Sequence, residues 1–222
     1  MLWTEKYRPS KLSDIAGQEH FVLDAEQWVL ENNMPNVLAY GMQGTGKTGA
    51  AIALAKSMLG DTFKDNFFEV NASDDRRLET VRTTIKQVAQ SGTLGDAPFR
   101  IMLLDEMDGM TSDAQNALKR IMERYANNIR FIITCNDKSR IIFPLQSRCA
   151  NYRFNPLKNE IVLEVIKNIL DKEQVEGFAD EDLARFIYDL DGDLRRAITE
   201  IQAAKASNFT LRKQVQDSLK EF

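Results

Sequence analysis

The chain has 222 residues, of which 43% are hydrophobic and 28% are charged, and these values are typical of a globular protein with one large domain or one large and one small domain. The net charge of −4 and the pI of about 5.2 exclude a basic footprint over the whole chain, so any nucleic-acid contact must come from a local patch. No apolar run is long enough to span a bilayer, and the N-terminal stretch "MLWTEKYRPS" lacks the apolar core of a signal peptide. We therefore expect a protein that is cytoplasmic or nuclear, is not secreted and has no membrane partner.

The chain has two cysteines, Cys135 and Cys149, and one histidine, His20. Two cysteines are too few for a metal site, and we expect buried thiols rather than a disulfide. With one histidine, an active site built around histidine is not expected, and His20 is predicted to lie on the surface or at the start of a helix.

Short apolar runs alternate with helical patterns over the first 156 residues. Strands are expected at residues 36–40, 67–72, 99–106, 130–136 and 151–154, with helical stretches between them. The runs "IMLLD" and "FIIT" are apolar at consecutive positions, which is typical of central strands buried on both faces. Strands that alternate with helices predict an α/β fold with a five-stranded, mainly parallel sheet covered on both faces.

The segment 113–128 has helical periodicity. One buried stripe is predicted from residues three and four apart, namely Ala114, Ala117, Leu118, Ile121, Met122 and Tyr125. The sequence "SDAQ" (112–115) is typical of a capping box, in which Ser112 is the N-cap and the side chain of Gln115 reaches back to it.

The pattern changes after Pro156. Three amphipathic helices are predicted at 158–173, 179–190 and 193–206 without strands between them, and the stretch 209–222 is a candidate for a short fourth helix. We place a boundary at residues 155–158, which divides the chain into a first domain, 1–156, that contains the predicted sheet, and a small helical domain, 157–222.

Residues 41–48, "GMQGTGKT", match the P-loop pattern G-x-x-x-x-G-K-[ST], with a predicted strand before them and a predicted helix after them. A phosphate chain needs a ring of bare backbone N–H groups, and the helix N-terminus adds a favourable dipole. Lys47 is expected to reach the β- and γ-phosphates, and the Thr48 hydroxyl to ligate Mg²⁺. The alternative is a glycine-rich turn without a ligand. The residues predicted to bind nucleotide here are Gly41, Gly44, Thr45, Gly46, Lys47 and Thr48.

The apolar run "IMLLDEMD" ends in two acidic residues, Asp105 and Glu106. Asp105 is predicted to hold the Mg²⁺ directly or through water, and Glu106 to orient and deprotonate the attacking water. Acidic residues at the carboxyl end of a strand, on the same edge as a P-loop, suit catalysis. A solvated turn charge is the structural alternative, and it fits Asp108 better than Asp105 or Glu106.

Together with these motifs, several stretches resemble the small subunits of replication factor C, the archaeal or eukaryotic-type sliding-clamp loader within the AAA+ ATPases. The resemblance covers essentially the whole chain. It rests on "WTEKYRP" (3–9), "DIAGQEH" (14–20), "GTGKT" (44–48), "NASD" (71–74), "LLDEMD" (103–108), "TCN" (134–136), "PLQSRCA" (144–150) and "GDLRRAI" (192–198). A P-loop alone indicates an NTPase, whereas "PLQSRC" with "KYRP" is far more specific. The resemblance implies an AAA+ ATPase domain followed by a helical lid, with ATP and Mg²⁺ as cofactors.

The resemblance also implies roles for residues outside the two motifs. Residues that would enclose adenine are Tyr7, Arg8, Pro9, Ile15 and Gly17, although an arm with a purely structural role is an alternative. Asn136 resembles sensor 1, which holds the lytic water or touches the γ-phosphate. Arg195 resembles sensor 2, which reaches from the lid to the γ-phosphate. Arg148 resembles the arginine finger, which acts in trans on ATP bound by a neighbouring subunit.

A DNA contact is implied by the helix "ETVRTTIKQVAQ" (79–90), where Val81, Ile85 and Val88 form one buried stripe. Arg82 and Lys86 are four residues apart on the adjacent face, and the family presents cations from this helix to DNA phosphates. A solvated basic face is the alternative. Two lesser candidates for DNA contact are Ser139 and Arg140, and in the family Gln115 helps to couple DNA contact to the catalytic acid.

The chain departs from the family pattern in places. Met42 and Gln43 follow the first P-loop glycine where the family usually has proline, and Arg76 and Arg77 add charge near the proposed DNA helix. The four-cysteine zinc module of bacterial loader subunits is missing. The sequence stops at Phe222, before the helical collar domain of the family, so we expect a fragment.

The resulting hypothesis is that the chain is the ATPase module of a clamp loader and that its ATPase activity is weak in isolation. Its partners would be the large subunit, other small subunits, a sliding clamp of the PCNA type and primer–template DNA. One alternative is another AAA+ DNA motor or initiator, such as a Holliday-junction helicase. Another is a scaffold subunit that binds nucleotide without turnover.

Overall fold

The computed structural model describes residues 1–72 and 78–207, with the backbone only for residues 78–82, 206 and 207. The chain divides into two compact units. The sheet unit comprises Pro9–Met42 and Lys47–Phe154, and the helical unit comprises Met1–Arg8, Gln43–Gly46 and the chain from Asn155. Arg76, Arg77 and the candidate helix 209–222 lie outside the described residues. No helix in the described part of the chain is both long and apolar enough to cross a lipid bilayer.

The sheet unit is built on a sheet of five strands within residues 1–72 and 78–207, in the order β2-β3-β4-β1-β5. The strands are β1 (Val37–Tyr40), β2 (Phe67–Asn71), β3 (Arg100–Asp105), β4 (Ile129–Cys135) and β5 (Ala150–Arg153). Every pairing is parallel, so all carboxyl ends lie at one edge of the sheet. The predicted α/β fold is confirmed.

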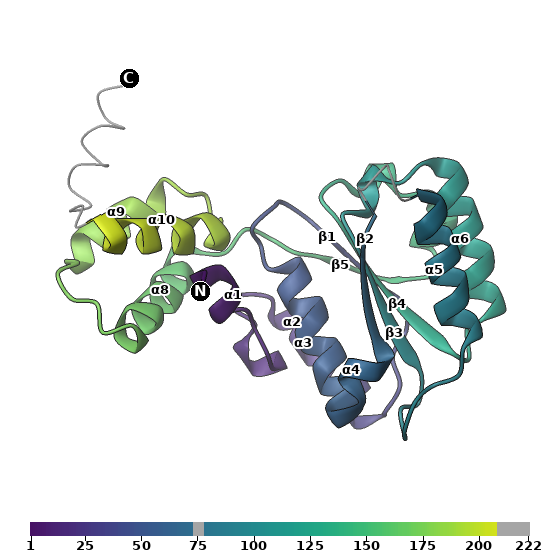
Figure 1. Cartoon of the computed structure of the whole chain (residues 1–222). Helices are drawn as coiled ribbons and strands as arrows, with labels where there is room; N and C mark the ends of the chain where they lie inside the picture. Colours follow the sequence, from purple (N-terminus) through teal and green to yellow (C-terminus); the bar gives the residue numbers. More distant parts are fainter. Residues whose placement is uncertain (73–77, 208–222) are drawn as a thin grey trace. The chain divides into compact units, whose positions relative to one another are not determined.

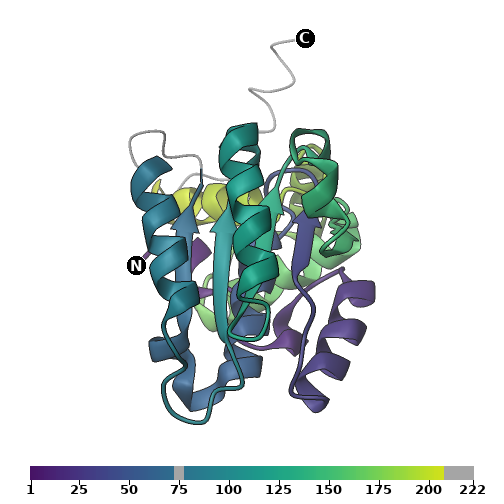
Figure 2. The same ribbon diagram turned by 90° about the vertical axis from the view of Figure 1, so that its right-hand side faces the viewer.

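Helices cover both faces of this sheet because successive strand side chains point to opposite sides. In β3, Ile101 and Leu103 join one apolar core with helices α2 (Glu19–Leu30) and α3 (Lys47–Leu59). Met102 and Leu104 join a second core with α5 (Leu78–Gln90) and α6 (Ser112–Arg124). Figure 1 shows the two helix pairs on opposite sides of the sheet, and Figure 2 looks onto α5 and α6, which lie side by side.

The stripe predicted for α6 is confirmed in part, and the predicted start and end of the helix are not. Ala114, Leu118 and Met122 are buried, whereas Ala117, Ile121 and Tyr125 are half-buried. The helix ends at Arg124, four residues before the predicted end, and Thr111 rather than Ser112 is its N-cap. The predicted N-cap is therefore wrong by one residue.

Gln115, the other half of the predicted capping box, does not reach back to the N-cap. It is 1% exposed, and its amide nitrogen donates to the carbonyls of Met110 (3.0 Å) and Arg140 (2.9 Å). Its Oε1 accepts from the Ile142 N–H at 2.8 Å. Gln115 therefore fixes a distant loop instead of capping its own helix.

The helical unit has its own apolar core. It contains the predicted helices, observed as α8 (Asn159–Lys172), α9 (Asp180–Tyr188) and α10 (Leu194–Ser207), together with the short N-terminal helix α1 (Trp3–Lys6). Trp3 is 4% exposed in this core, and its backbone N–H donates to Gln202 Oε1 at 2.9 Å. The segment 1–8 thus packs with α8–α10, although the sequence boundary at 156 assigns it to the first domain. The other short helices of the described residues all belong to the sheet unit: η1 (Leu12–Asp14), η2 (Gly60–Thr62), α4 (Phe63–Asn66), η4 (Met107–Gly109), η5 (Lys138–Arg140) and α7 (Phe143–Gln146).

Candidate functional site

The P-loop sequence forms the turn from β1 into α3. Gly41, Gly44 and Gly46 have positive φ angles of 148°, 81° and 92°, which L side chains rarely adopt. A Cβ on Gly41 would come within 2.2 Å of the Phe154 carbonyl oxygen, whereas a Cβ on Gly46 would meet nothing within 4 Å. Glycine at 41 therefore permits close packing onto the end of β5, and glycine at 46 leaves open space beside the helix N-terminus.

Lys47, the first residue of α3, is 8% exposed and points back into this turn. Its ammonium donates to the carbonyl oxygens of Gly41 (2.8 Å) and Met42 (2.7 Å) and to Asn136 Oδ1 (3.0 Å). The ammonium is thus held at the carboxyl edge of the sheet by protein oxygens, which an incoming phosphate would have to replace in part.

Thr48, the second residue of α3, contacts Asp105 at the end of β3. The Thr48 hydroxyl donates to the Asp105 carboxylate, at 3.0 Å from Oδ1 and 3.2 Å from Oδ2. A hydroxyl and a carboxylate are the hard oxygen donors that Mg²⁺ prefers, and Mg²⁺ commonly completes its shell with water and substrate phosphates. In the described residues no group of three or more His, Cys, Asp or Glu side chains is placed to hold a metal. The donor set fits Mg²⁺ bound together with a phosphate.

Glu106 follows β3 in a left-handed backbone conformation, with φ 54° and ψ 45°. This conformation costs about 1–2 kcal/mol in an L residue, so other contacts must hold it. The Glu106 N–H donates to Thr134 Oγ1 at 3.1 Å, and Glu106 Oε2 accepts from Asn71 Nδ2 at 3.4 Å. The same Thr134 hydroxyl donates to Asp105 Oδ1. Both predicted acidic residues are therefore tied to neighbouring strands.

The structure brings five of the predicted residues together at the carboxyl edge of the sheet, namely Lys47, Thr48, Asp105, Glu106 and Asn136. Cys135 lies next to this group in β4, and burial raises its pKa to about 12, with a further contribution from the negative charge of Asp108. Its thiol is therefore protonated at neutral pH and is no nucleophile. Cys135 and Cys149 are both free, as predicted.

Arg148 lies at the opposite edge of the sheet. It precedes β5, whose first residue, Ala150, pairs with Val37 at the start of β1, whereas the P-loop follows the end of β1. Its guanidinium pairs with Glu123 and donates to the Pro144 carbonyl at 2.7 Å, and the side chain is 35% exposed. Arg148 is thus at the other edge of the sheet from Lys47 of the same chain, and its action in trans stays a prediction.

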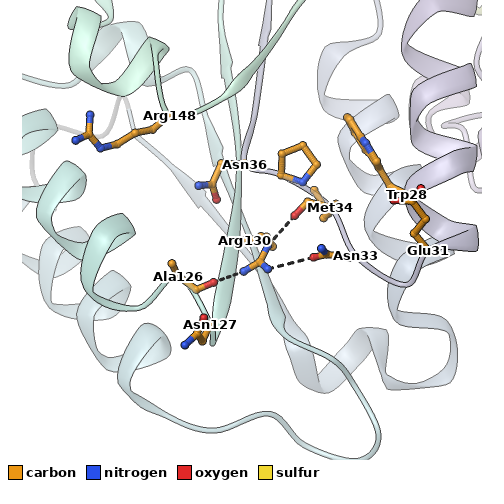
Figure 3. Close-up of a pocket in the computed structure, with 10 residues that line it drawn as sticks. Trp28, Glu31, Asn33, Met34, Asn36, Ala126, Asn127, Arg130 and Arg148 are labelled. Atoms are coloured by element: carbon orange, nitrogen blue, oxygen red, sulfur yellow. Dashed lines mark hydrogen bonds between the residues drawn. The ribbon is translucent and has the colours of Figure 1, made fainter.

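A pocket of about 590 Å³ opens beside Arg148 (Figure 3). Arg130 forms part of its wall and is fixed by carbonyl oxygens of Met34 (2.7 Å) and Ala126 and by Asn33 Oδ1 (3.2 Å). Burial lowers the pKa of Arg130. The pocket lies at the amino ends of β1, β4 and β5, so it is separate from the carboxyl edge of the sheet where Lys47 and Asp105 lie. Its lining residues are Trp28, Glu31, Asn33, Met34, Pro35, Asn36, Ala126, Asn127, Arg130 and Arg148.

The predicted adenine contacts divide between the two units. In the helical unit, the Tyr7 hydroxyl donates to Glu173 Oε1 at 2.8 Å, and Arg8 pairs with Glu5 at 2.7 Å. The sheet unit contains Pro9, Ile15 and Gly17, and Ile15 packs against the core that includes α2 and α3. Arg195 is exposed on α10 of the helical unit. Their roles toward a nucleotide stay predictions.

Of the residues predicted to contact DNA, Lys86 of α5 is exposed, and the side chain of Arg82 lies outside the described residues. In the predicted buried stripe of the same helix, Ile85 and Val88 are buried, and the side chain of Val81 lies outside the described residues. Ser139 and Arg140, the lesser candidates, are exposed on η5.

Sequence reasoning gave no role to Thr134 or Asn71, although both fall in stretches quoted for the family resemblance. A single polar residue inside the apolar run "RFIITC" was the available signal for Thr134. A buried hydroxyl in a central strand needs hydrogen-bond partners, and only the register between strands reveals them.

A parallel five-stranded sheet with a P-loop, an acidic strand end and an amide on the next strand defines an AAA-type nucleotide-binding domain. The family model described as "ATPase family associated with various cellular activities (AAA)" matches residues 37–157.

The similar proteins fall into two groups, relatives that share the sequence and solved structures that share the fold at low identity. The chain is 46% identical over 204 residues to the replication factor C small subunit of Methanococcus maripaludis, covering 92% of this chain and 64% of the relative. It is 49% identical over 202 residues to that of Methanothermobacter thermautotrophicus, covering 91% and 62%. The RuvB Holliday junction branch migration motor of Thermotoga maritima shares the fold, with a TM-score of 0.71 at 18% identity, covering 86% of this chain and 63% of that one.

The chain belongs to the replication factor C small-subunit family within the AAA ATPases. It spans somewhat less than two thirds of the length of these two relatives. The predicted membership is confirmed, whereas the Holliday-junction alternative shares only the fold.

Proposed function

We propose that the chain binds ATP with Mg²⁺ at the carboxyl edge of its sheet and hydrolyses it. The proposal is carried by one observation: at this edge Lys47 donates to Asn136 at 3.0 Å, and the hydroxyl of the next residue, Thr48, donates to Asp105 at 3.0–3.2 Å. This combination of an ammonium, a hydroxyl, a carboxylate and an amide suits a phosphate chain with a divalent cation.

Each residue has a distinct task in the proposal. Lys47 exchanges part of its bonds to loop carbonyls for bonds to the β- and γ-phosphates, while P-loop N–H groups at the start of α3 bind phosphate oxygens. Thr48 and Asp105 hold Mg²⁺, which neutralises charge on the phosphates when it is bound. Asn136 orients the lytic water or the γ-phosphate through its amide.

Glu106 acts as the general base in this proposal. Glu106 lies one residue beyond the proposed metal-binding carboxylate, in a left-handed turn, and its carboxylate accepts from Asn71 at the end of the neighbouring strand. A positioned base of this kind accepts a proton from the water that attacks the γ-phosphorus, and such catalysis contributes about 10²–10⁴-fold in rate.

The larger role follows the family. We propose that the chain is the ATPase module of a clamp loader, with residues 157–222 as a lid and Arg195 as a contact from the lid to the γ-phosphate. Arg148 would act on ATP of a neighbouring subunit, because it lies at the opposite edge of the sheet from its own P-loop. The partners in this proposal are the large subunit, other small subunits, a PCNA-type clamp and primer–template DNA, with Lys86 and Arg82 contacting DNA phosphates.

Glu106→Gln separates binding from turnover. We expect binding of a fluorescent ATP analogue to stay within about threefold of the parent chain, while single-turnover phosphate release slows about 100-fold or more. Unchanged phosphate release would show that Glu106 is not the general base. A parent chain that binds ATP but never releases phosphate, even with intact neighbours, would support the scaffold alternative instead.

Arg148→Ala tests the contribution in trans within the assembled complex. An arginine finger is worth about 10³–10⁵-fold, so steady-state hydrolysis at that interface should fall to the background rate. ATP binding by the same subunit should be unchanged, since the P-loop lies at the other edge of its sheet. Glu123→Gln, which removes the carboxylate that forms the ion pair with Arg148 and keeps Arg148 itself, is the matched control and should retain hydrolysis.

A further inference from the structure

Thr134 is the feature of the site that the sequence left without a role. It lies in β4, where Ala39 of β1 is its register partner, and β4 also pairs with β3 so that Ile133 lies opposite Leu104. The next position along that register brings Thr134 beside Asp105. Its side chain is on the carboxyl edge of the central strands and the residue is 1% exposed.

One hydroxyl group at this position joins the two acidic residues. The single proton of Thr134 Oγ1 is donated to Asp105 Oδ1, so the oxygen is free to accept from the Glu106 N–H at 3.1 Å. Asp105 in turn accepts from Thr48. The chain of contacts therefore runs from the first turn of α3 through Asp105 and Thr134 to the backbone of Glu106.

We propose that Thr134 is a positioning residue for hydrolysis. It holds the backbone of Glu106 in its left-handed turn and fixes the rotamer of Asp105, without contacting the nucleotide. The turn needs such support because glutamate has a Cβ and no intrinsic preference for positive φ, and an alternative extended backbone would redirect its carboxylate. The Asn71–Glu106 contact of 3.4 Å at the far end of the side chain is long and cannot fix the backbone by itself.

The inference about rate rests on the proposed ATP hydrolysis, whereas the inference about the backbone does not. Thr134→Val preserves the shape and β-branching of the side chain and removes the hydroxyl. We expect single-turnover hydrolysis to fall about 10- to 100-fold, because small displacements of a catalytic group are costly. Affinity for the ATP analogue should stay within about threefold, since the P-loop amides and Lys47 are unchanged.

Two further variants distinguish a missing hydroxyl from a disturbed fold. Thr134→Ser retains the hydroxyl and should restore most of the rate. Thr62→Val removes a comparable hydroxyl, which donates to the Leu59 carbonyl at 2.7 Å at the other end of α3, and should leave the rate unchanged. Equal losses in binding and turnover, or a valine variant as active as the parent, would overturn the inference.

Amide hydrogen exchange tests the contact without any requirement for catalysis. In the parent chain the Glu106 amide should be protected although its residue lies beyond the end of β3, and in Thr134→Val it should exchange about tenfold faster. An unprotected Glu106 amide in the parent chain would overturn the inference whether or not the valine variant folds. A parent chain that neither binds nor hydrolyses ATP but shows this protection would refute the proposed function and leave the backbone role of Thr134 intact.

Discussion

Two carboxylates, Asp105 in the sheet unit and Glu173 in the helical unit, are held by different kinds of partner. The carboxylate of Asp105 accepts from the hydroxyls of Thr48 and Thr134, which carry no charge. That of Glu173 accepts from the ammonium of Lys6 at 2.6 Å and from the hydroxyl of Tyr7 at 2.8 Å, with Lys205 at 3.4 Å. Glu173 is therefore paired with cations within the fold, whereas the hydrogen-bond partners of Asp105 are uncharged.

The surroundings explain why Glu173 needs these cations. It is the C-cap of α8, where the helix dipole is unfavourable for a negative charge. The hydrogen bonds from Lys6 and Tyr7 outweigh this and hold the pKa of Glu173 at about 2, below its usual 4.5. The comparison indicates that Glu173 supports the fold, by tying the segment 1–8 to α8 and α10, whereas Asp105 is the carboxylate that the proposed function assigns to Mg²⁺.

The same carboxylate-to-amide change should therefore have opposite consequences in the two units, and Asp105→Asn should have the larger effect. Magnesium-dependent turnover is expected to fall about 100-fold or more, because an amide cannot neutralise the metal. The melting temperature should change little, since asparagine still accepts from the two threonine hydroxyls. Asp113→Asn, the same change on the exposed first turn of α6, is the matched control for turnover and should be neutral.

Glu173→Gln should act on stability and leave the rate of hydrolysis at the sheet edge nearly unchanged. Since the folded-state pKa is depressed, the charged form contributes stability that is fully present above pH 4.5 and is lost as the pH falls toward about 2. We expect the variant to melt below the parent at pH 7, and the difference to shrink between pH 4.5 and 2. A difference that stays constant over this range would mean that the carboxylate charge is not what stabilises the helical unit.

The sequence predicted the elements that depend on local periodicity. All five strands and the three helices after Pro156 lie within one or two residues of their expected ends, because their apolar patterns alone decide which face is buried. Lys47, Thr48 and Asp105 meet because a P-loop and a parallel strand end share one edge. The N-cap of α6 was misplaced because Thr111 and Ser112 are adjacent hydroxyl residues with equal capping chemistry.

What the sequence could not predict depends on contacts between distant residues. Gln115 bonds to a loop 25–27 residues away, and Tyr7 bonds to Glu173, 166 residues away. The residue type at position 106 does not indicate a left-handed turn, because positive φ is usually expected at glycine or asparagine and not at glutamate. Register between β3 and β4 is what brings Thr134 to Asp105, and single-residue register cannot be read from apolar runs.

The most direct test of the central claim is isothermal titration calorimetry of ATP with Mg²⁺ against this chain and against Lys47→Ala. The account predicts one binding event per chain that requires Mg²⁺ for full affinity, with affinity reduced about 100-fold or more in the alanine variant, because the ammonium that pairs with the phosphates is gone. Absence of binding heat in a folded parent chain, or equal affinity in Lys47→Ala, would contradict a nucleotide site at the carboxyl edge of the sheet.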